Sequence, residues 1–216
     1  GMRLVDITGP LENGMWRYPD PYPEVRLEEI PVPEWIPYPT YSWVFTLGSQ
    51  SGTYLETAAH MFRGAMSIDQ VPLERLVLET AVIQLHEVGP NEAITAEDLE
   101  GAQVDMRPGD ALLVATGWGS RWHAPDFVEN CPYFTREAME WVFRREVSLM
   151  GADMPRFDSW RTPQLFFAEF FQRDILLLAP LVNLRAITRP RVRLIALPLK
   201  VVGACGSPCR AIVIEE

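Results

Sequence analysis

Cysteine and histidine are scarce in this chain, and each occurs three times in 216 residues. The cysteines, Cys131, Cys205 and Cys209, form an odd set without paired spacing, which argues against a disulfide framework and favours a reducing, cytoplasmic location. Cys205 and Cys209 make a C-x3-C, but no second pair accompanies them to complete a zinc site. We therefore expect ordinary core or loop thiols.

The sequence also lacks an excess of positive charge and a long apolar run. Its net charge is −10 with a pI near 4.9, whereas nucleic acids and anionic membranes bind basic surfaces. The most apolar run, residues 175–184, contains Pro180 and Asn183 and is too short to cross a bilayer. We expect neither a nucleic acid nor a membrane as partner, and a small-molecule ligand instead.

The length of 216 residues and a hydrophobic content of 48% suit one globular domain spanning residues 1–216. Apolar runs predict more strands than helices, and capping residues mark the helix starts. Period-2 alternation over residues 41–47 predicts a half-buried strand. The other expected strands are at 4–8, 81–85, 111–116, 147–152, 175–178, 192–197, 199–202 and 210–214. The expected helices begin at Thr95, Thr135 and Gln164.

Residues 19–39 are rich in proline and aromatic side chains. Seven prolines there exclude a helix and disfavour a central strand. Aromatic residues such as Tyr22, Trp35 and Tyr38 argue against a disordered linker. We expect an ordered, extended arm that packs on its own domain, helps to close a pocket or reaches across a dimer.

Polar side chains recur at short spacing in residues 49–62. If this segment is extended, Gln50, Tyr54 and Glu56 share one face. If it then makes a helical turn, Glu56 and His60 share a face as an i, i+4 pair. One short segment can therefore direct an amide, a phenol, a carboxylate and an imidazole at one point.

The same segment resembles a family signature. The cyclase / kynurenine formamidase-like family of metal-dependent hydrolases carries His-x-Gly-Thr-His-x-Asp-x-Pro-x-His, and this chain reads Gln50-Ser51-Gly52-Thr53-Tyr54-Leu55-Glu56-Thr57-Ala58-Ala59-His60. Further matches, in the same order along the chain, are Asp6-Ile7-Thr8, Gly109-Asp110, Thr116-Gly117-Trp118, Gly151-Ala152-Asp153 and Asn183-Leu184. The resemblance implies an α/β fold, a swivelling β/β/α domain with a barrel-like mixed sheet and a few helices. It also implies a homodimer or higher homo-oligomer that hydrolyses a small-molecule amide or ester, as an arylformamidase does.

The chain departs from this family where the resemblance places metal ligands. Gln50 and Tyr54 replace the first two of the three signature histidines, the two that would hold metal, and Glu56 replaces the aspartate, whereas the last histidine is kept as His60. In the register set by the later Asn-Leu run, Phe167 and Ala179 replace a histidine and a glutamate. Zinc and manganese sites need three or more nitrogen, sulfur or carboxylate ligands, so we expect no metal and no other cofactor.

The remaining groups predict a metal-free acid–base site. His60 can act as a general base, Glu56 can orient or charge it, and Tyr54 can donate to a developing oxyanion. Further side chains are expected to line the substrate pocket: Gln50, Phe167, Trp118 and Asp153.

Three function classes stay open on these residues. The first is a hydrolase of the family, the second a metal-free lyase or isomerase, and the third a non-catalytic small-molecule-binding homologue. In the third class, His60 and Glu56 are only an internally satisfied polar pair. Metal analysis separates the first class from the others, and stabilisation by small molecules separates the second from an inert scaffold.

Overall fold

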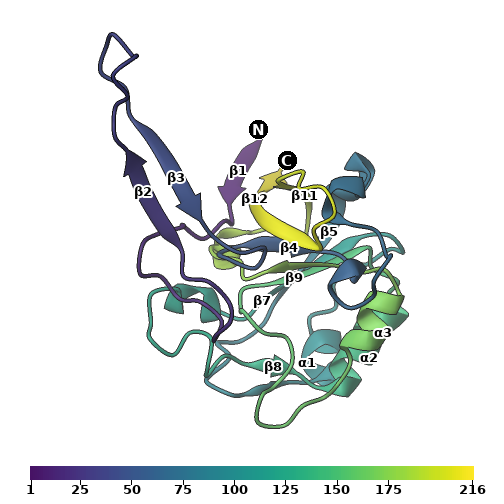
Figure 1. Ribbon diagram of the computed structural model, residues 1–216. Coiled ribbons are helices and arrows are strands. Elements are labelled where there is room, and N and C mark those ends of the chain that lie inside the picture. The colour runs from purple at the N-terminus through teal and green to yellow at the C-terminus, as the bar shows by residue number, and fades with distance from the viewer.

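Seven strands close into a barrel at the centre of the computed structural model, which describes residues 1–216 (Figure 1). Around the ring they are β4 (Tyr54–Glu56), β12 (Gly206–Glu215), β11 (Arg191–Pro198), β5 (Val77–Gln84), β7 (Ala111–Ala115), β9 (Leu149–Ala152) and β10 (Leu176–Ala179). The barrel closes because β4 pairs with both β10 and β12. Outside the ring, β1 (Arg3–Asp6) pairs with β12, and β6 (Ala93–Ile94) pairs with β8 (Tyr133–Phe134).

The sheet is mixed, and side chains leave its strands alternately on two faces. Strands β5, β7, β9 and β10 run parallel, whereas β4, β11 and β12 pair antiparallel with their neighbours. Along β7, Leu113 points into the barrel interior, while Leu112 and Val114 join the core outside it. All three are fully buried, as expected for parallel strands covered on both faces. The expected α/β fold with a barrel-like mixed sheet is confirmed.

Three α-helices cover the outer face: α1 (Ala96–Gly101), α2 (Arg136–Arg144) and α3 (Phe167–Gln172). Thr95 caps α1 by accepting from Asp98 N, and Thr135 caps α2 by accepting from Ala138 N, as the sequence predicts. The structure also has 3-10 helices η1 (Ala58–His60), η2 (Ile68–Gln70), η3 (Leu73–Arg75), η4 (Trp118–Arg121) and η5 (Leu184–Ala186). None of the helices is long and apolar enough to span a bilayer.

Two expected elements differ from the structure. The strand at 199–202 is wrong: β11 ends at Pro198, and the chain turns so that Ala204 N donates to Val201 O. The third helix begins at Phe167 rather than Gln164, because the side chain of Asp158 accepts from Gln164 N and ties the preceding chain into a loop.

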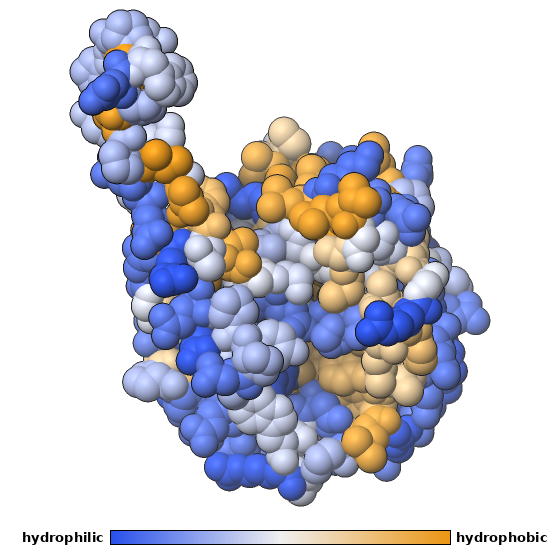
Figure 2. Space-filling view, viewed as in Figure 1, coloured by the Kyte–Doolittle hydropathy of each residue, from blue (hydrophilic) through white to orange (hydrophobic).

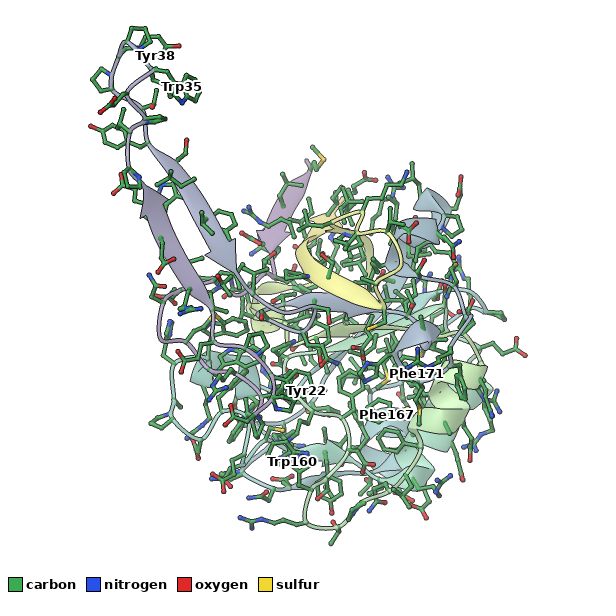
Figure 3. The ribbon with its side chains drawn as sticks, viewed as in Figure 1. Tyr22, Trp35, Tyr38, Trp160, Phe167 and Phe171 are labelled. Atoms are coloured by element: carbon green, nitrogen blue, oxygen red, sulfur yellow. The ribbon has the colours of Figure 1, made fainter.

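The proline-rich arm divides into a packed part and a projecting part. In its first part, Val25 is buried against the domain. Beyond it, β2 (Arg26–Ile30) and β3 (Ser42–Thr46) pair as a hairpin that extends away from the barrel (Figures 1 and 3). At the tip of this hairpin Trp35 is 81% exposed and Tyr38 is 65% exposed.

The strand expected at 41–47 exists as β3, but the expectation that it is half-buried is wrong. Four of its five residues are exposed, including Trp43 and Phe45, because no other element of the chain covers the hairpin. Figure 2 shows apolar side chains along this hairpin and over the nearby end of the barrel. The exposed apolar residues of that barrel end include Leu197, Leu199, Val201 and Val202.

Candidate active site

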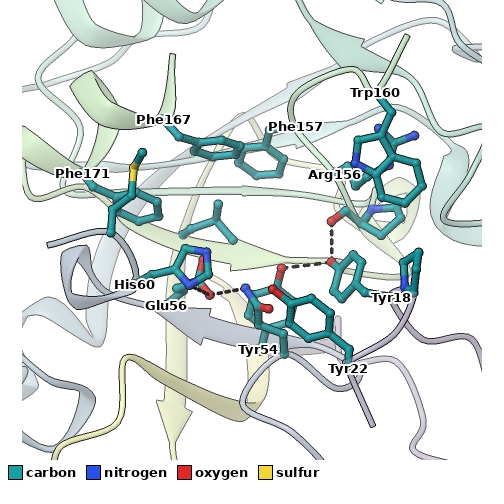
Figure 4. Close-up of a pocket in the computed structure, with 15 residues that line it drawn as sticks. Tyr18, Tyr22, Tyr54, Glu56, His60, Arg156, Phe157, Trp160, Phe167 and Phe171 are labelled. Carbon is teal, nitrogen blue, oxygen red and sulfur yellow. Dashed lines mark hydrogen bonds and ion pairs between the residues drawn. The ribbon is translucent and has the colours of Figure 1, made fainter. Parts of the chain in front are cut away.

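A cavity of about 350 Å³ opens on the outer face of the barrel beside β4 (Figure 4). Segments far apart in sequence form its wall: the start of the arm, β4 with η1, the loop after β9, and α3. Its lining residues are Tyr18, Pro19, Tyr22, Gln50, Tyr54, Glu56, His60, Met61, Pro155, Arg156, Phe157, Trp160, Phe167, Phe171 and Leu177.

Strand alternation in β4 brings the polar groups to this cavity. Tyr54 and Glu56 point to it, whereas Leu55 points into the barrel interior. The chain then turns at η1, where the Thr57 side chain accepts from Ala59 N, and this turn places His60 above Glu56. The extended pattern holds for Tyr54 and Glu56, and the Glu56–His60 pair meets at the turn as expected, whereas Gln50 reaches the cavity from a turn before β4.

The carboxylate of Glu56 is the centre of the polar cluster. It accepts a hydrogen bond of 2.5 Å from Gln50 Nε2, and its Oε2 lies 3.3 Å from His60 Nδ1. Only 2% of Glu56 is exposed, and no lysine or arginine pairs with it. Burial raises the pKa of this carboxyl to about 8, although the Gln50 bond acts in the opposite direction. Burial also lowers the pKa of His60, so its imidazole is neutral near pH 7.

A buried hydrogen-bond chain fixes the proton of Tyr54. Tyr18 Oη donates to the carbonyl of Pro155 at 2.5 Å and lies 3.0 Å from Tyr54 Oη. A carbonyl oxygen can only accept, so the Tyr18 proton points to Pro155 and the Tyr54 proton points to Tyr18. Burial raises the pKa of both phenols. The hydroxyl oxygen of Tyr54 can therefore accept a hydrogen bond from a group in the cavity. It can donate to an oxyanion there only if its hydrogen bond to Tyr18 breaks.

Aromatic rings form the wall opposite these polar groups (Figures 3 and 4). Phe167 and Phe171, one turn apart on α3, stack with centroids 5.8 Å apart, and Phe171 also meets the ring of His60 edge-on. Trp160 covers the guanidinium of Arg156 at 3.8 Å. An apolar wall facing a few converging polar groups is typical of a small-molecule site.

Two predicted pocket residues lie elsewhere, and that expectation needs correction. Trp118 is buried, with its indole nitrogen donating to Phe127 O. Asp153 is buried at the end of β9 and accepts from Thr116 N, Thr116 Oγ1 and Gly117 N. It fixes the loop after β7, which is the capping role common for aspartate at strand ends. The other five predicted residues, Gln50, Tyr54, Glu56, His60 and Phe167, share the cavity.

The donor set at the family's metal positions does not fit a zinc or manganese ion. Ala179 presents a methyl group buried in β10, and Phe167 presents a ring. The Gln50 amide directs its nitrogen at Glu56, and Tyr54 is a protonated phenol bonded to Tyr18. Only Glu56 remains as an ordinary ligand at these positions, too few for either ion.

Sequence reasoning missed two site residues. Tyr18 orders the proton of Tyr54, and Cys205 Sγ lies 3.9 Å from His60 Nδ1. Cys205 reaches the site because β12 pairs with β4 so that Gly206 lies opposite Glu56. That pairing is not visible in a single sequence without the barrel.

The closed mixed barrel, with a carboxyl group and an imidazole at a cavity on its outer face, defines the class of this protein as an α/β barrel domain. The chain belongs to the Cyclase family, described as "Putative cyclase", whose pattern matches residues 5–159. The kynurenine formamidase of Bordetella pertussis is 29% identical over 170 residues, covering 79% of this chain and 78% of that protein. The kynurenine formamidase of Bordetella petrii is 31% identical over 170 residues, with 78% of each chain covered. These relatives support a hydrolase of this family.

Solved structures share the fold. An isatin hydrolase bound to the product analogue thioisatinate superposes with a TM-score of 0.86 at 22% identity, covering 99% of this chain and 92% of that one. Isatin hydrolase A from Ralstonia solanacearum gives a TM-score of 0.83 at 24% identity, covering 100% and 92%. At this identity the likeness establishes the architecture alone.

Proposed function

We propose that the protein hydrolyses a small amide or ester with an aromatic part, an arylformamidase-like reaction that proceeds without the family's metal. Kinship with kynurenine formamidases supports the reaction class, and the aromatic wall supports the substrate class. The observation that carries the proposal is the pairing of the His60 imidazole with the buried carboxyl group of Glu56 at the cavity.

The geometry supports a general-base mechanism. When Glu56 is ionised, it holds the ring proton of His60 on Nδ1, which leaves the Nε2 lone pair to take a proton from water. The water oxygen then bonds to the substrate carbonyl carbon, and the C–N or C–O bond breaks as Nε2 returns the proton to the leaving group. Gln50 uses one amide hydrogen on Glu56, so its second can stabilise the developing oxyanion.

A non-catalytic binding role is the second candidate. Gln50 and Tyr54 already make hydrogen bonds within the protein. Polar groups that are paired in this way can be structural and need not act on a substrate, which favours a non-catalytic role. A lyase or isomerase would use the same His60 base to remove a carbon-bound proton from the substrate. Its product would contain no oxygen from water, which distinguishes it from a hydrolase in an assay.

The experiment is a hydrolysis assay on chelator-washed protein with aryl formamides, anilides and phenyl esters. We expect His60→Ala to lower kcat/KM by about 10²–10⁴-fold. The matched control is His86→Ala, because His86 is an exposed histidine that pairs with Glu92 away from the cavity. Equal rates in wild type and His60→Ala would overturn the mechanism. Stabilisation by aromatic amides without turnover would instead support the binding role.

We also infer a homodimer or higher homo-oligomer in the cytoplasm. The projecting hairpin supports association, because it exposes Trp35, Tyr38 and Trp43 to solvent in the single chain. Three free cysteines support a reducing compartment.

A further inference from the structure

We propose that Glu56, His60 and Cys205 form a site for a thiophilic divalent cation of the zinc class, and that this cation blocks the His60 base. The second half rests on the proposed function, whereas the first half stands on geometry alone. The three residues offer one oxygen, one nitrogen and one sulfur atom, all within 4.8 Å of one another.

The separations suit a tetrahedral ion. His60 Nδ1 lies 3.3 Å from Glu56 Oε2 and 3.9 Å from Cys205 Sγ. Zinc bonds of about 2.0–2.3 Å at tetrahedral angles separate donor atoms by about 3.3–3.6 Å. The nitrogen–oxygen separation lies within this range, whereas the sulfur lies slightly beyond it from His60 and must move closer to complete the three-ligand arrangement.

The arrangement points to a cation rather than to a cysteine nucleophile. A nucleophile–base–orienter chain needs the thiol and the carboxylate at opposite ring nitrogens. Here Glu56 and Cys205 both approach the same nitrogen, Nδ1 of His60. Three donor atoms that converge on one point are the geometry of a coordination site.

Backbone pairing holds the three ligands in place. Glu56 lies opposite Gly206 in the β4–β12 ladder, directly beside Cys205. The carbonyl of Cys205 accepts from Thr57 N at 2.8 Å and from Thr57 Oγ1 at 3.2 Å. Gln50 Nε2 donates to the same carboxylate oxygen, Oε2, that faces His60, and it holds the Glu56 side chain in place as outer-shell donors do at metal sites.

This ligand set differs from the family's metal positions, and its thiolate favours zinc over manganese. Only Glu56 is common to both, because His60 and Cys205 stand outside the replaced positions. One thiolate and one imidazole favour zinc, cobalt or cadmium, whereas magnesium, calcium and manganese favour oxygen ligands. Three protein ligands also leave a fourth position open.

Occupancy would remove the catalytic base. A neutral imidazole has one lone pair, so a cation on Nδ1 of His60 requires a proton on Nε2. The ring then has no lone pair with which to take a proton from water. In this protein, a zinc-class ion therefore acts as an inhibitor.

The test titrates chelator-washed protein with Co²⁺, whose bond to a thiolate gives a near-ultraviolet charge-transfer band. We expect one equivalent to bind with this band, and Cys205→Ser or Cys205→Ala to abolish the band. Cys209→Ala is the matched control, since Cys209 faces the barrel interior and should leave the band unchanged. Absence of the band in wild type, or its persistence in both Cys205 variants, would overturn the site.

Inhibition of hydrolysis by zinc tests whether the bound cation blocks the His60 base. We expect zinc to inhibit the wild type and to need more than about a tenfold higher concentration in Cys205→Ser. Activation by zinc would overturn the blocking role. If the wild type hydrolyses no substrate, the proposed function fails, and the cobalt spectrum still decides the site.

Discussion

His60 Nδ1 lies 3.3 Å from Oε2 of Glu56, and that carboxylate has no arginine or lysine partner. Desolvation acts on the two groups in opposite directions, since it raises the pKa of Glu56 and lowers that of His60. The pair is therefore held near neutrality, and its protonation state sets whether the imidazole can serve as a base.

The rate of hydrolysis should depend on the ionisation of Glu56. In chelator-washed protein, we expect kcat/KM to rise with pH through an inflection at about 8, where Glu56 loses its proton and fixes the His60 tautomer. Glu56→Gln cannot ionise and should lose this inflection. A wild-type profile that is flat from about pH 6 to about pH 9, across the expected inflection, would contradict this role.

The unfolding free energy should fall with rising pH because of the raised pKa of Glu56. The raised pKa means that folded protein keeps the Glu56 proton up to about pH 8, whereas the unfolded chain loses it near the ordinary glutamate pKa of 4.5. Relative to Glu56→Gln, the wild type should therefore lose unfolding free energy as pH rises from about 4.5 to 8, by up to about 5 kcal/mol. Denaturant unfolding of both proteins at a series of pH values measures this difference. A difference that is constant with pH would mean that Glu56 titrates normally.

Tyr18→Phe should free the proton of Tyr54. The change leaves Pro155 O without its donor in a buried position, and we expect it to cost about 1–3 kcal/mol of unfolding free energy. Tyr22→Phe is the matched control, because Tyr22 also lines the cavity but is 41% exposed. If the two variants unfold at the same denaturant concentration, the Tyr54–Tyr18–Pro155 hydrogen-bond chain does not contribute to the stability of the fold.

The hairpin should mediate self-association. Replacing the tip residues Trp35 and Tyr38 with serine removes exposed aromatic surface while leaving the barrel and cavity intact. We expect a smaller mass by light scattering at micromolar concentration, with an unchanged unfolding transition in the barrel. A wild-type protein that is already monomeric would show the inferred association wrong.

The sequence predicts those parts of the site that local geometry determines. Tyr54 and Glu56 share a face because side chains alternate along a strand, and His60 joins them because a turn follows. Cys205 could not be placed in this way, since its position depends on the register of β12 against β4. Tyr18 depends likewise on how the arm packs across the loop that carries Pro155.

In the fold, too, the sequence predicts what local pattern determines and not what depends on distant parts of the chain. Apolar runs predict the barrel strands because parallel strands covered on both faces must be apolar. Alternation in β3 predicts a strand correctly but not its burial, because a pattern of large and small residues does not reveal what covers it. Asp153 ends a strand, as its position indicates, yet its carboxylate turns to Thr116 rather than to the cavity.

Metal-free catalysis by His60 is tested by the rate of aryl formamide hydrolysis by chelator-washed protein, measured with and without added zinc or manganese. We predict that wild type hydrolyses the substrate without metal, that His60→Ala does not, and that zinc lowers the wild-type rate. Hydrolysis that is absent until zinc or manganese is supplied, and is then insensitive to His60→Ala, would show that a metal and not His60 activates the water.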